Sequence, residues 1–224
     1  MSTQSTSIEP ARLTLRERKR ALYRTVILDA AEAVFAADGY DAAQVTHIAK
    51  TAGVSLTTMY SVLPSKWEIY RAVNGRRLSQ LMKNAHGIVG DGASAFTTLL
   101  AGIRMQLEFL MSHQNYTRIQ LRDVAGWSTV GAQRTPEQEQ GLRFGLQLYA
   151  GLFRQAIDDG VFVEEDPEVM ARMVIANQQV RLALWVERGC KQNMTEVIHG
   201  MLRQLIRSWS RPECVQRLLE QVQS

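Results

Sequence analysis

The sequence predicts an all-α protein of about nine or ten helices. Apolar residues recur at helical spacing along most of the 224 residues, and no stretch shows the alternation of a convincing strand. Capping patterns mark helix starts, among them Thr14-Leu15-Arg16-Glu17 and Thr135-Pro136-Glu137-Gln138. With 46% apolar residues, the chain is long enough to form one large core or two small ones.

The first helix is expected to begin at the Thr14 capping box and to stop at Gly39. A glycine tolerates the positive φ that often ends a helix. The residues that recur at helical spacing along its apolar face are Val26, Ile27, Ala30, Val34 and Phe35.

A helix-turn-helix is expected next. Residues 46–51 form a short helix, Ala52-Gly53-Val54 supply a tight turn, and Ser55 caps a second helix that places Met59 in the core. The outward residues of the second helix are Leu56, Thr57, Thr58, Tyr60 and Ser61. This arrangement suits a recognition helix that enters the major groove of DNA.

The rest of the chain reads as further helices. A second capping box, Ser65-Lys66-Trp67-Glu68, opens a long helix that joins the DNA-binding part to the remainder. Later helices are expected at about 96–110, 116–125, 135–159, 166–187 and 197–209. A loop rich in Gly, Ser and Thr separates two of them at 126–134.

Composition favours a cytoplasmic protein. No segment approaches the ~20 apolar residues of a membrane span, and the polar N-terminus lacks the apolar core of a signal peptide. Cys190 and Cys214 have no metal-site spacing, so neither a disulfide framework nor a bound metal is expected.

Positive charge gathers near the N-terminus. Residues 1–77 contain 11 Lys or Arg and 7 Asp or Glu, whereas residues 78–224 contain 15 of each. The run from Arg12 to Arg24 holds six basic residues against the single acid Glu17, which is typical of a surface beside a phosphate backbone. A solvated helix face is the alternative for this run.

Specific residues in this region match a known family. They are Ile27-Leu28-Asp29-Ala30-Ala31, Phe35, Gly39-Tyr40, Ile48-Ala49, Ala52-Gly53-Val54-Ser55, Tyr60 and Ser65-Lys66. In their order and spacing the sequence resembles the TetR family of bacterial transcriptional regulators, and the match stops near Val73. The resemblance implies a flexible tail at 1–11, a helix-turn-helix DNA-binding domain at 12–68 and an all-α regulatory, ligand-binding and dimerisation domain at 69–224.

The candidate DNA contacts divide by chemistry. Leu56, Thr57 and Ser61 are expected at base edges, because hydroxyls donate or accept and an apolar group can touch a thymine methyl. The expected phosphate contacts are Arg16, Arg20, Gln44, Ser55, Thr58, Tyr60 and Lys66. A packing role for Tyr60 remains an alternative.

Three positions depart from the family pattern. Ala43-Gln44 stands in place of a Thr pair, Thr57 in place of a Gly or Pro, and Val62-Leu63 in place of two aromatic or His residues. Two contacts that the family makes to the DNA backbone are therefore in question, and DNA affinity is expected to depend more on the N-terminal arm.

The resemblance also implies a small-molecule pocket in the middle of the chain. The candidates are Arg104, Met105, Glu108, Phe109, Arg122, Trp127, Phe144, Gln147, Tyr149, Asn177, Gln178 and Arg181. The alternatives are ordinary core packing for the apolar members and interhelical pairing for the charged ones.

Two apolar helices near the C-terminus suggest a homodimer interface, as the family commonly forms a four-helix bundle there. The candidates are Val180, Leu184, Ile198, Leu202, Leu205 and Trp209. An ordinary intrachain core explains the same apolar stripes equally well.

These patterns predict a DNA-binding regulator without enzymatic activity, bound metal or cofactor. No catalytic motif or clustered His is present. The expected function is a dimeric repressor that binds a pseudo-palindromic operator in double-stranded DNA and is released by a small-molecule inducer. One alternative is a regulator controlled by a protein partner, and another is an α-helical enzyme or carrier.

Overall fold

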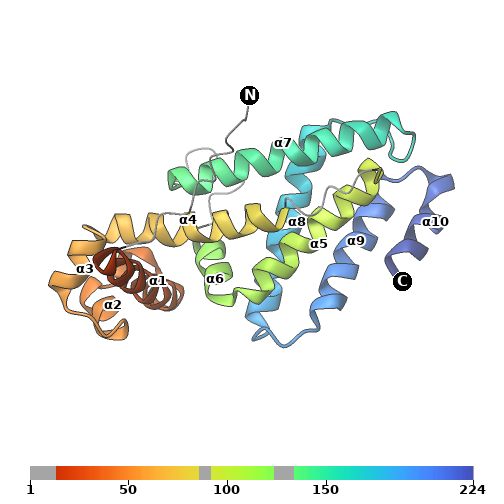
Figure 1. Cartoon of the computed structure of the whole chain (residues 1–224). Helices are drawn as coiled ribbons and strands as arrows, with labels where there is room; N and C mark the ends of the chain where they lie inside the picture. Colours follow the sequence, from red (N-terminus) through yellow and green to blue (C-terminus); the bar gives the residue numbers. More distant parts are fainter. Residues whose placement is uncertain (1–13, 86–91, 124–133, 224) are drawn as a thin grey trace, which may run out of the picture.

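The computed structural model describes residues 14–85, 92–123 and 134–223, which form ten α-helices (Figure 1). The helices are α1 (Leu15–Ala42), α2 (Val45–Thr51), α3 (Leu56–Val62), α4 (Lys66–Ala85), α5 (Ala95–Ser112), α6 (Gln114–Asp123), α7 (Pro136–Asp158), α8 (Pro167–Glu187), α9 (Met194–Trp209) and α10 (Pro212–Gln223). The predicted all-α class is confirmed. Among the described helices, none combines the length and apolar character needed to cross a bilayer.

Local capping chemistry places the helix starts where the sequence predicts them. Thr14 and Thr135 both form complete capping boxes, with Glu17 and Gln138 respectively. Asp166 accepts a hydrogen bond from the Glu168 N–H at the start of α8. Each of these bonds satisfies an N–H group that the helix itself leaves unpaired.

Gly39 interrupts the first helix without ending it. Its φ of 80° and ψ of 169° are not helical, yet one further turn continues to Ala42. The expectation that the helix stops at Gly39 is therefore wrong by one turn. This kink turns the chain toward α2 and leaves Tyr40 against the first turns of α4.

The first three helices pack around one core together with the start of α4. Its members include Ile27, Phe35, Ile48, Met59 and Tyr70, all buried. An aromatic cluster reinforces this core, because the Phe35 and Tyr70 rings meet edge to face with centroids 5.0 Å apart. The core extends to Val73, so the expected domain boundary at residue 68 lies within a helix that both parts share.

A second and larger core lies among α5 and α7–α10. Helices α7 and α8 pack side by side, α5 contacts α7 and α9, and α10 covers α9 (Figure 1). A single backbone bridge within the described residues joins Phe162, between α7 and α8, to Ser210 at the end of α9.

Helices α4 and α6 connect the two cores. The long α4 runs from the DNA-binding end to contact α5 and α7, and α6 packs closely against α1. Ile119 of α6 is buried inside the first core rather than the second. Two separate helices therefore contact both parts of the molecule.

Candidate DNA interface and ligand cavity

The helix-turn-helix is built by short-range bonds. Gly53 adopts a φ of 66°, a left-handed conformation that glycine takes at little cost, and the Val54 N–H donates to the Ala49 carbonyl at 3.0 Å. Ser55 then caps α3 by accepting the Thr58 N–H at 3.0 Å. Met59 is fully buried beneath α3, as the sequence predicts.

The outer face of α3 is open to solvent. Leu56, Thr57 and Ser61 are exposed, and Tyr60 is 46% exposed, so its side chain does not pack between helices. The Ser61 hydroxyl donates to the Thr58 carbonyl at 2.7 Å, which leaves its oxygen lone pairs available to a donor from DNA. This surface has the size and chemistry of a recognition helix, although the structure alone assigns no base contact.

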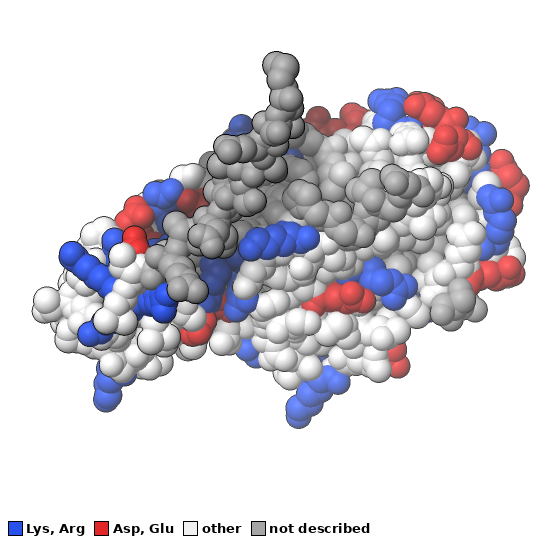
Figure 2. Space-filling model, in the orientation of Figure 1, with Lys and Arg blue, Asp and Glu red and all other residues white. Residues whose placement is uncertain are grey.

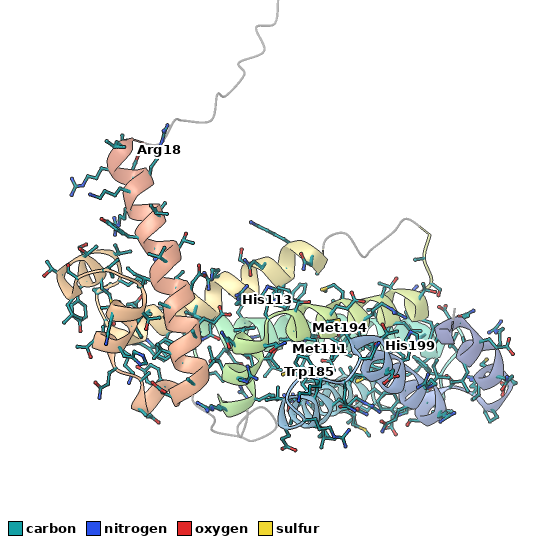
Figure 3. The ribbon with its side chains drawn as sticks, turned by 90° about the horizontal axis from the view of Figure 1, so that it is seen from below. Arg18, Met111, His113, Trp185, Met194 and His199 are labelled. Carbon is teal, nitrogen blue, oxygen red and sulfur yellow. The ribbon has the colours of Figure 1, made fainter. Side chains whose placement is uncertain are left out.

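The predicted phosphate contacts surround that face. Arg16 and Arg20 are exposed on the first turns of α1, which project beyond the other helices at the end marked by Arg18 (Figure 3). Gln44 is exposed and makes no side-chain cap to α2. Figure 2 shows several basic side chains over this end of the molecule.

Lys66 is held at the joint between α1 and α4. Its Nζ donates to the main-chain oxygen of Asp41 at 2.9 Å and lies 4.8 Å from the centroid of the Tyr40 ring. The ammonium has three N–H donors, so these contacts position it and still permit a phosphate contact. Its role on DNA stays a prediction.

A cavity of about 150 Å³ lies between α4, α5, α6, α7 and α8. Most of its wall is aliphatic or aromatic, as is usual for small-molecule sites. Apolar side chains come from all five helices and include Leu78, Met82, Met105, Leu121, Phe144 and Leu182. The volume is comparable to an apolar cavity that holds benzene, so a longer ligand must extend through the open side.

The polar groups of the cavity wall are mostly paired with one another. The Asn74 Oδ1 accepts from Gln120 Nε2 at 2.9 Å, which joins α4 to α6, and the Tyr149 hydroxyl donates to Gln106 Oε1 at 2.6 Å. Burial raises the pKa of Tyr149 well above its ordinary value, so this phenol is neutral.

One acid also lines the cavity. Glu137 of α7 binds Arg71 of α4 through two hydrogen bonds, at 2.7 and 3.3 Å. Burial alone would raise the pKa of Glu137, but hydrogen bonds, with Arg71 first among them, bring it below its usual range. The acid is therefore ionised and neutralised by the helix that leads to the DNA-binding end.

Comparison with known proteins agrees with this geometry. The family model described as "Bacterial regulatory proteins, tetR family" matches residues 27–73. The chain belongs to the TetR family of transcriptional regulators. DNA binding through the helix-turn-helix is thereby confirmed, as is the prediction that the chain is not an enzyme.

Relatives share nearly the whole length of this TetR protein. It is 24% identical over 191 residues to the fatty acid metabolism regulator protein of Bacillus subtilis (strain 168), covering 85% of this chain and 96% of that protein. The solved structure of FadR from Bacillus subtilis in complex with stearoyl-CoA has a TM-score of 0.69 at 22% identity, covering 81% and 96% of the two chains.

A further solved structure is SmeT, the repressor of the Stenotrophomonas maltophilia multidrug efflux pump SmeDEF. It has a TM-score of 0.65 at 21% identity and covers 84% of this chain and 91% of its own. At these identities the similarity to solved structures shows the fold.

The cavity contains only some of the side chains that were predicted to form a pocket in this TetR protein. Met105, Phe144, Tyr149 and Gln178 line it. Seven of the predicted residues lie outside its wall, namely Arg104, Glu108, Phe109, Arg122, Gln147, Asn177 and Arg181. Trp127 lies outside the described residues.

Helix orientation explains these misses. Gly102, Met105 and Gln106 define the cavity face of α5, so Arg104 and Glu108 point elsewhere. On α8, Arg181 turns away from the cavity to reach the carbonyl oxygen of Gly200 at 3.1 Å. The remaining outliers either face solvent or pack within and between neighbouring helices.

Sequence reasoning missed several polar residues of the wall, among them Asn74, Gln106 and Gln120. A detectable signal existed for two of them, since Asn74 follows the buried Val73 and Gln120 stands between two apolar residues. A buried amide inside an apolar pattern needs a partner, and these two satisfy each other.

The predicted dimer surface of the TetR protein also needs correction. Ile198, Leu202 and Leu205 are buried inside the chain's own core, and Trp209 packs against Phe153 with ring centroids 5.4 Å apart. Because α5, α8 and α10 pack against α9, the first three side chains have no exposed surface to offer a second protomer, whereas Trp209 is partly exposed. Only Val180 and Leu184 of the predicted set remain exposed.

Those two belong to an apolar stripe on α8. Val169, Met173, Ala176, Val180 and Leu184 recur every three or four residues and all are exposed. Val180 is 60% exposed in the single chain. Such a continuous apolar face marks a surface that normally binds a partner.

Proposed function

We propose that this protein is a dimeric repressor whose affinity for its operator is controlled by an apolar small molecule in the cavity. The observation that carries the proposal is the position of the cavity. Its walls include α4 and α6, the two helices that also pack into the core of the DNA-binding end. A ligand that binds one arrangement of these helices better than another shifts the population between them.

The DNA-binding part comprises residues 12–68 in this proposal, and residues 69–224 regulate it. Leu56, Thr57 and Ser61 read base edges, while Arg16, Arg20, Gln44, Ser55, Thr58, Tyr60 and Lys66 contact phosphates. One protomer reads half of the site. Two recognition helices related by a two-fold axis therefore match a pseudo-palindromic operator.

The α8 stripe supports the dimer. A second copy of the chain would cover Val169, Met173, Ala176, Val180 and Leu184 with the same surface of its own α8, as a two-fold interface requires. The length of α8, 21 residues, allows the stripe to run along several turns. The interface thus rests on α8 rather than on the buried stripe of α9.

Fatty acyl compounds are the first ligand class to test. One relative is named for fatty acid metabolism, and the FadR structure from Bacillus subtilis contains stearoyl-CoA. A mostly aliphatic cavity suits an acyl chain, and its open side gives a large headgroup room outside. Stearoyl-CoA is accordingly the first probe.

A matched pair of glycines on α7 gives a clean test. A Cβ atom added at Gly145, which lines the cavity, meets no atom within 4 Å, and the same holds at Gly151, which lies outside the cavity wall. Gly145→Leu should therefore fill the cavity without a clash, and Gly151→Leu serves as its control. Both changes alter helix propensity equally.

The assay uses an operator obtained by selection from random DNA, followed by fluorescence anisotropy with increasing stearoyl-CoA. Wild type and Gly151→Leu should release DNA, whereas Gly145→Leu should bind DNA normally and resist release. If stearoyl-CoA has no effect on the wild type, or releases both variants equally, cavity control by this ligand class is refuted. Regulation by a protein partner would then be the hypothesis to test.

A further inference from the structure

The amides of Gln178 and Gln179 are exceptions among the polar groups of the cavity wall. Gln178 is 3% exposed, and its Nε2 has no hydrogen-bond partner among the residues that the structure describes. It lies beside the Tyr149 hydroxyl, whose oxygen can accept one of the two amide N–H groups because its own proton goes to Gln106. The neighbouring Gln179 also lines the cavity with a buried Nε2 that lacks a described partner.

Two unpaired amide donors at one place on α8 create a demand for an acceptor. Buried polar groups are nearly always hydrogen-bonded, and an unpaired one is costly until a ligand or water satisfies it. The neighbouring Asn74 and Gln120 amides do not meet this demand, because they bond to each other. The second N–H of Gln178 and the amide of Gln179 therefore need an acceptor from whatever occupies the cavity.

The charges of the wall limit what that acceptor can be. Among the described residues that line the cavity, none is Lys, Arg or His, and the one charged side chain is Glu137. The Arg71 guanidinium, outside the wall, is already engaged by that acid. A carboxylate buried here would lack a cation, which is strongly unfavourable, whereas an uncharged carbonyl needs only the amide donors.

We infer that the cavity selects an uncharged acyl carbonyl compound, such as an ester or thioester, and that the Gln178 amide donates to its carbonyl oxygen. This inference rests on the proposed ligand control and narrows its ligand class. The acyl chain lies against the aliphatic wall, and the free acid is excluded by its charge. Gln178 is thus a residue that determines specificity.

Three probes of equal chain length separate the contributions. Methyl octanoate offers an uncharged carbonyl, octanoate at pH 8 offers a charged one, and octane offers none. Direct binding is measured by calorimetry or ligand-induced thermal shift on the full chain, without DNA. The wild type should bind methyl octanoate about tenfold more tightly than octane, the value for one net hydrogen bond, and octanoate should bind more weakly than the ester.

Gln178→Met removes the donors at nearly constant volume. It should cost about tenfold in affinity for methyl octanoate and leave octane binding unchanged. Gln147→Met is the matched control, since Gln147 is exposed and outside the cavity wall, and it should change neither. If octanoate binds as tightly as the ester, or Gln178→Met keeps full ester affinity, the inference is overturned.

The outcomes also separate this inference from the proposed function. Ester binding that depends on Gln178 but does not release DNA would support the inference and refute ligand control. Binding of the probes without preference for the ester would refute the inference alone. Failure of all three probes to bind the wild type would refute the inference, while ligand control would still be decided by the stearoyl-CoA titration.

Discussion

Glu32 offers a sharp test of how the first helix is fixed to α4. It is 4% exposed and accepts from Arg77 Nη2 at 2.7 Å, Arg77 Nε at 2.9 Å and Arg76 Nη2 at 2.9 Å. Glu32→Gln keeps the size of the side chain but turns one acceptor oxygen into a donor. That NH₂ group must then face a guanidinium, and Arg77 loses its counter-charge, whereas Arg76 keeps its ion pair with Asp29.

The magnitude follows from burial. Removing one partner of a buried ion pair costs about 3–5 kcal/mol, and the partial exposure of both arginines favours the lower end, about 3 kcal/mol. For a chain of this length, that loss lowers Tm by roughly 6–12 °C. The control is Glu168→Gln, which breaks the exposed pair with Arg172 and should cost only ~0.3–0.5 kcal/mol.

Urea unfolding followed by tryptophan fluorescence measures both variants. Protein concentration is held fixed, because dimerisation makes apparent stability depend on it. Wild-type-like unfolding of Glu32→Gln, or a loss no larger than that of Glu168→Gln, would refute the view that this buried carboxylate fixes α1 to α4.

Three further predictions concern DNA, assembly and pH. Thr57→Ala should relax sequence preference at particular operator positions, while Lys66→Ala should weaken binding to all sequences about equally. Binding-site selection separates the two effects, and an unchanged sequence preference in both variants would show that the recognition surface lies elsewhere. Val180→Glu should shift the protein toward monomer in ultracentrifugation and weaken operator binding. If the variant remains a stable dimer, the interface does not lie on α8. Burial, with Arg104 and Arg203, lowers the pKa of His199, so the unfolded state takes up the proton first and stability should fall as pH drops below ~6.5. His199→Gln should remove that part of the loss between pH 7 and 5 in urea titrations, and an unaltered pH profile would exclude the role of His199.

Short-range chemistry made the helix starts and the recognition motif predictable. Thr14, Ser55 and Thr135 act on N–H groups within three residues, and Gly53 needs only its own backbone freedom. None of these depends on where distant helices lie. The same holds for burial of Met59, because the turn fixes which side of α3 faces the first two helices.

Tertiary choices were not predictable in the same way. The apolar stripe of α9 shows that Leu202 will be buried, but not whether α10 or another protomer covers it. Polar residues in the middle of α5 likewise gave no indication of the rotation that puts Gln106, and not Arg104, on the cavity wall. Glu32 was detectable as one acid within an apolar run, yet its partners lie over forty residues away.

Adjacent residues on α4 and α6 show how short the path from cavity to DNA is. Val73 is buried in the first core while Asn74, the next residue, lines the cavity; Ile119 and Gln120 repeat this division on α6. The Asn74–Gln120 hydrogen bond ties the two helices at that level. Close-packed cores do not deform gradually, so a ligand that separates these amides must move Val73 or Ile119 against α1. The proposed ligand control would therefore act on the recognition helix through two packed helices, without any long relay of side chains.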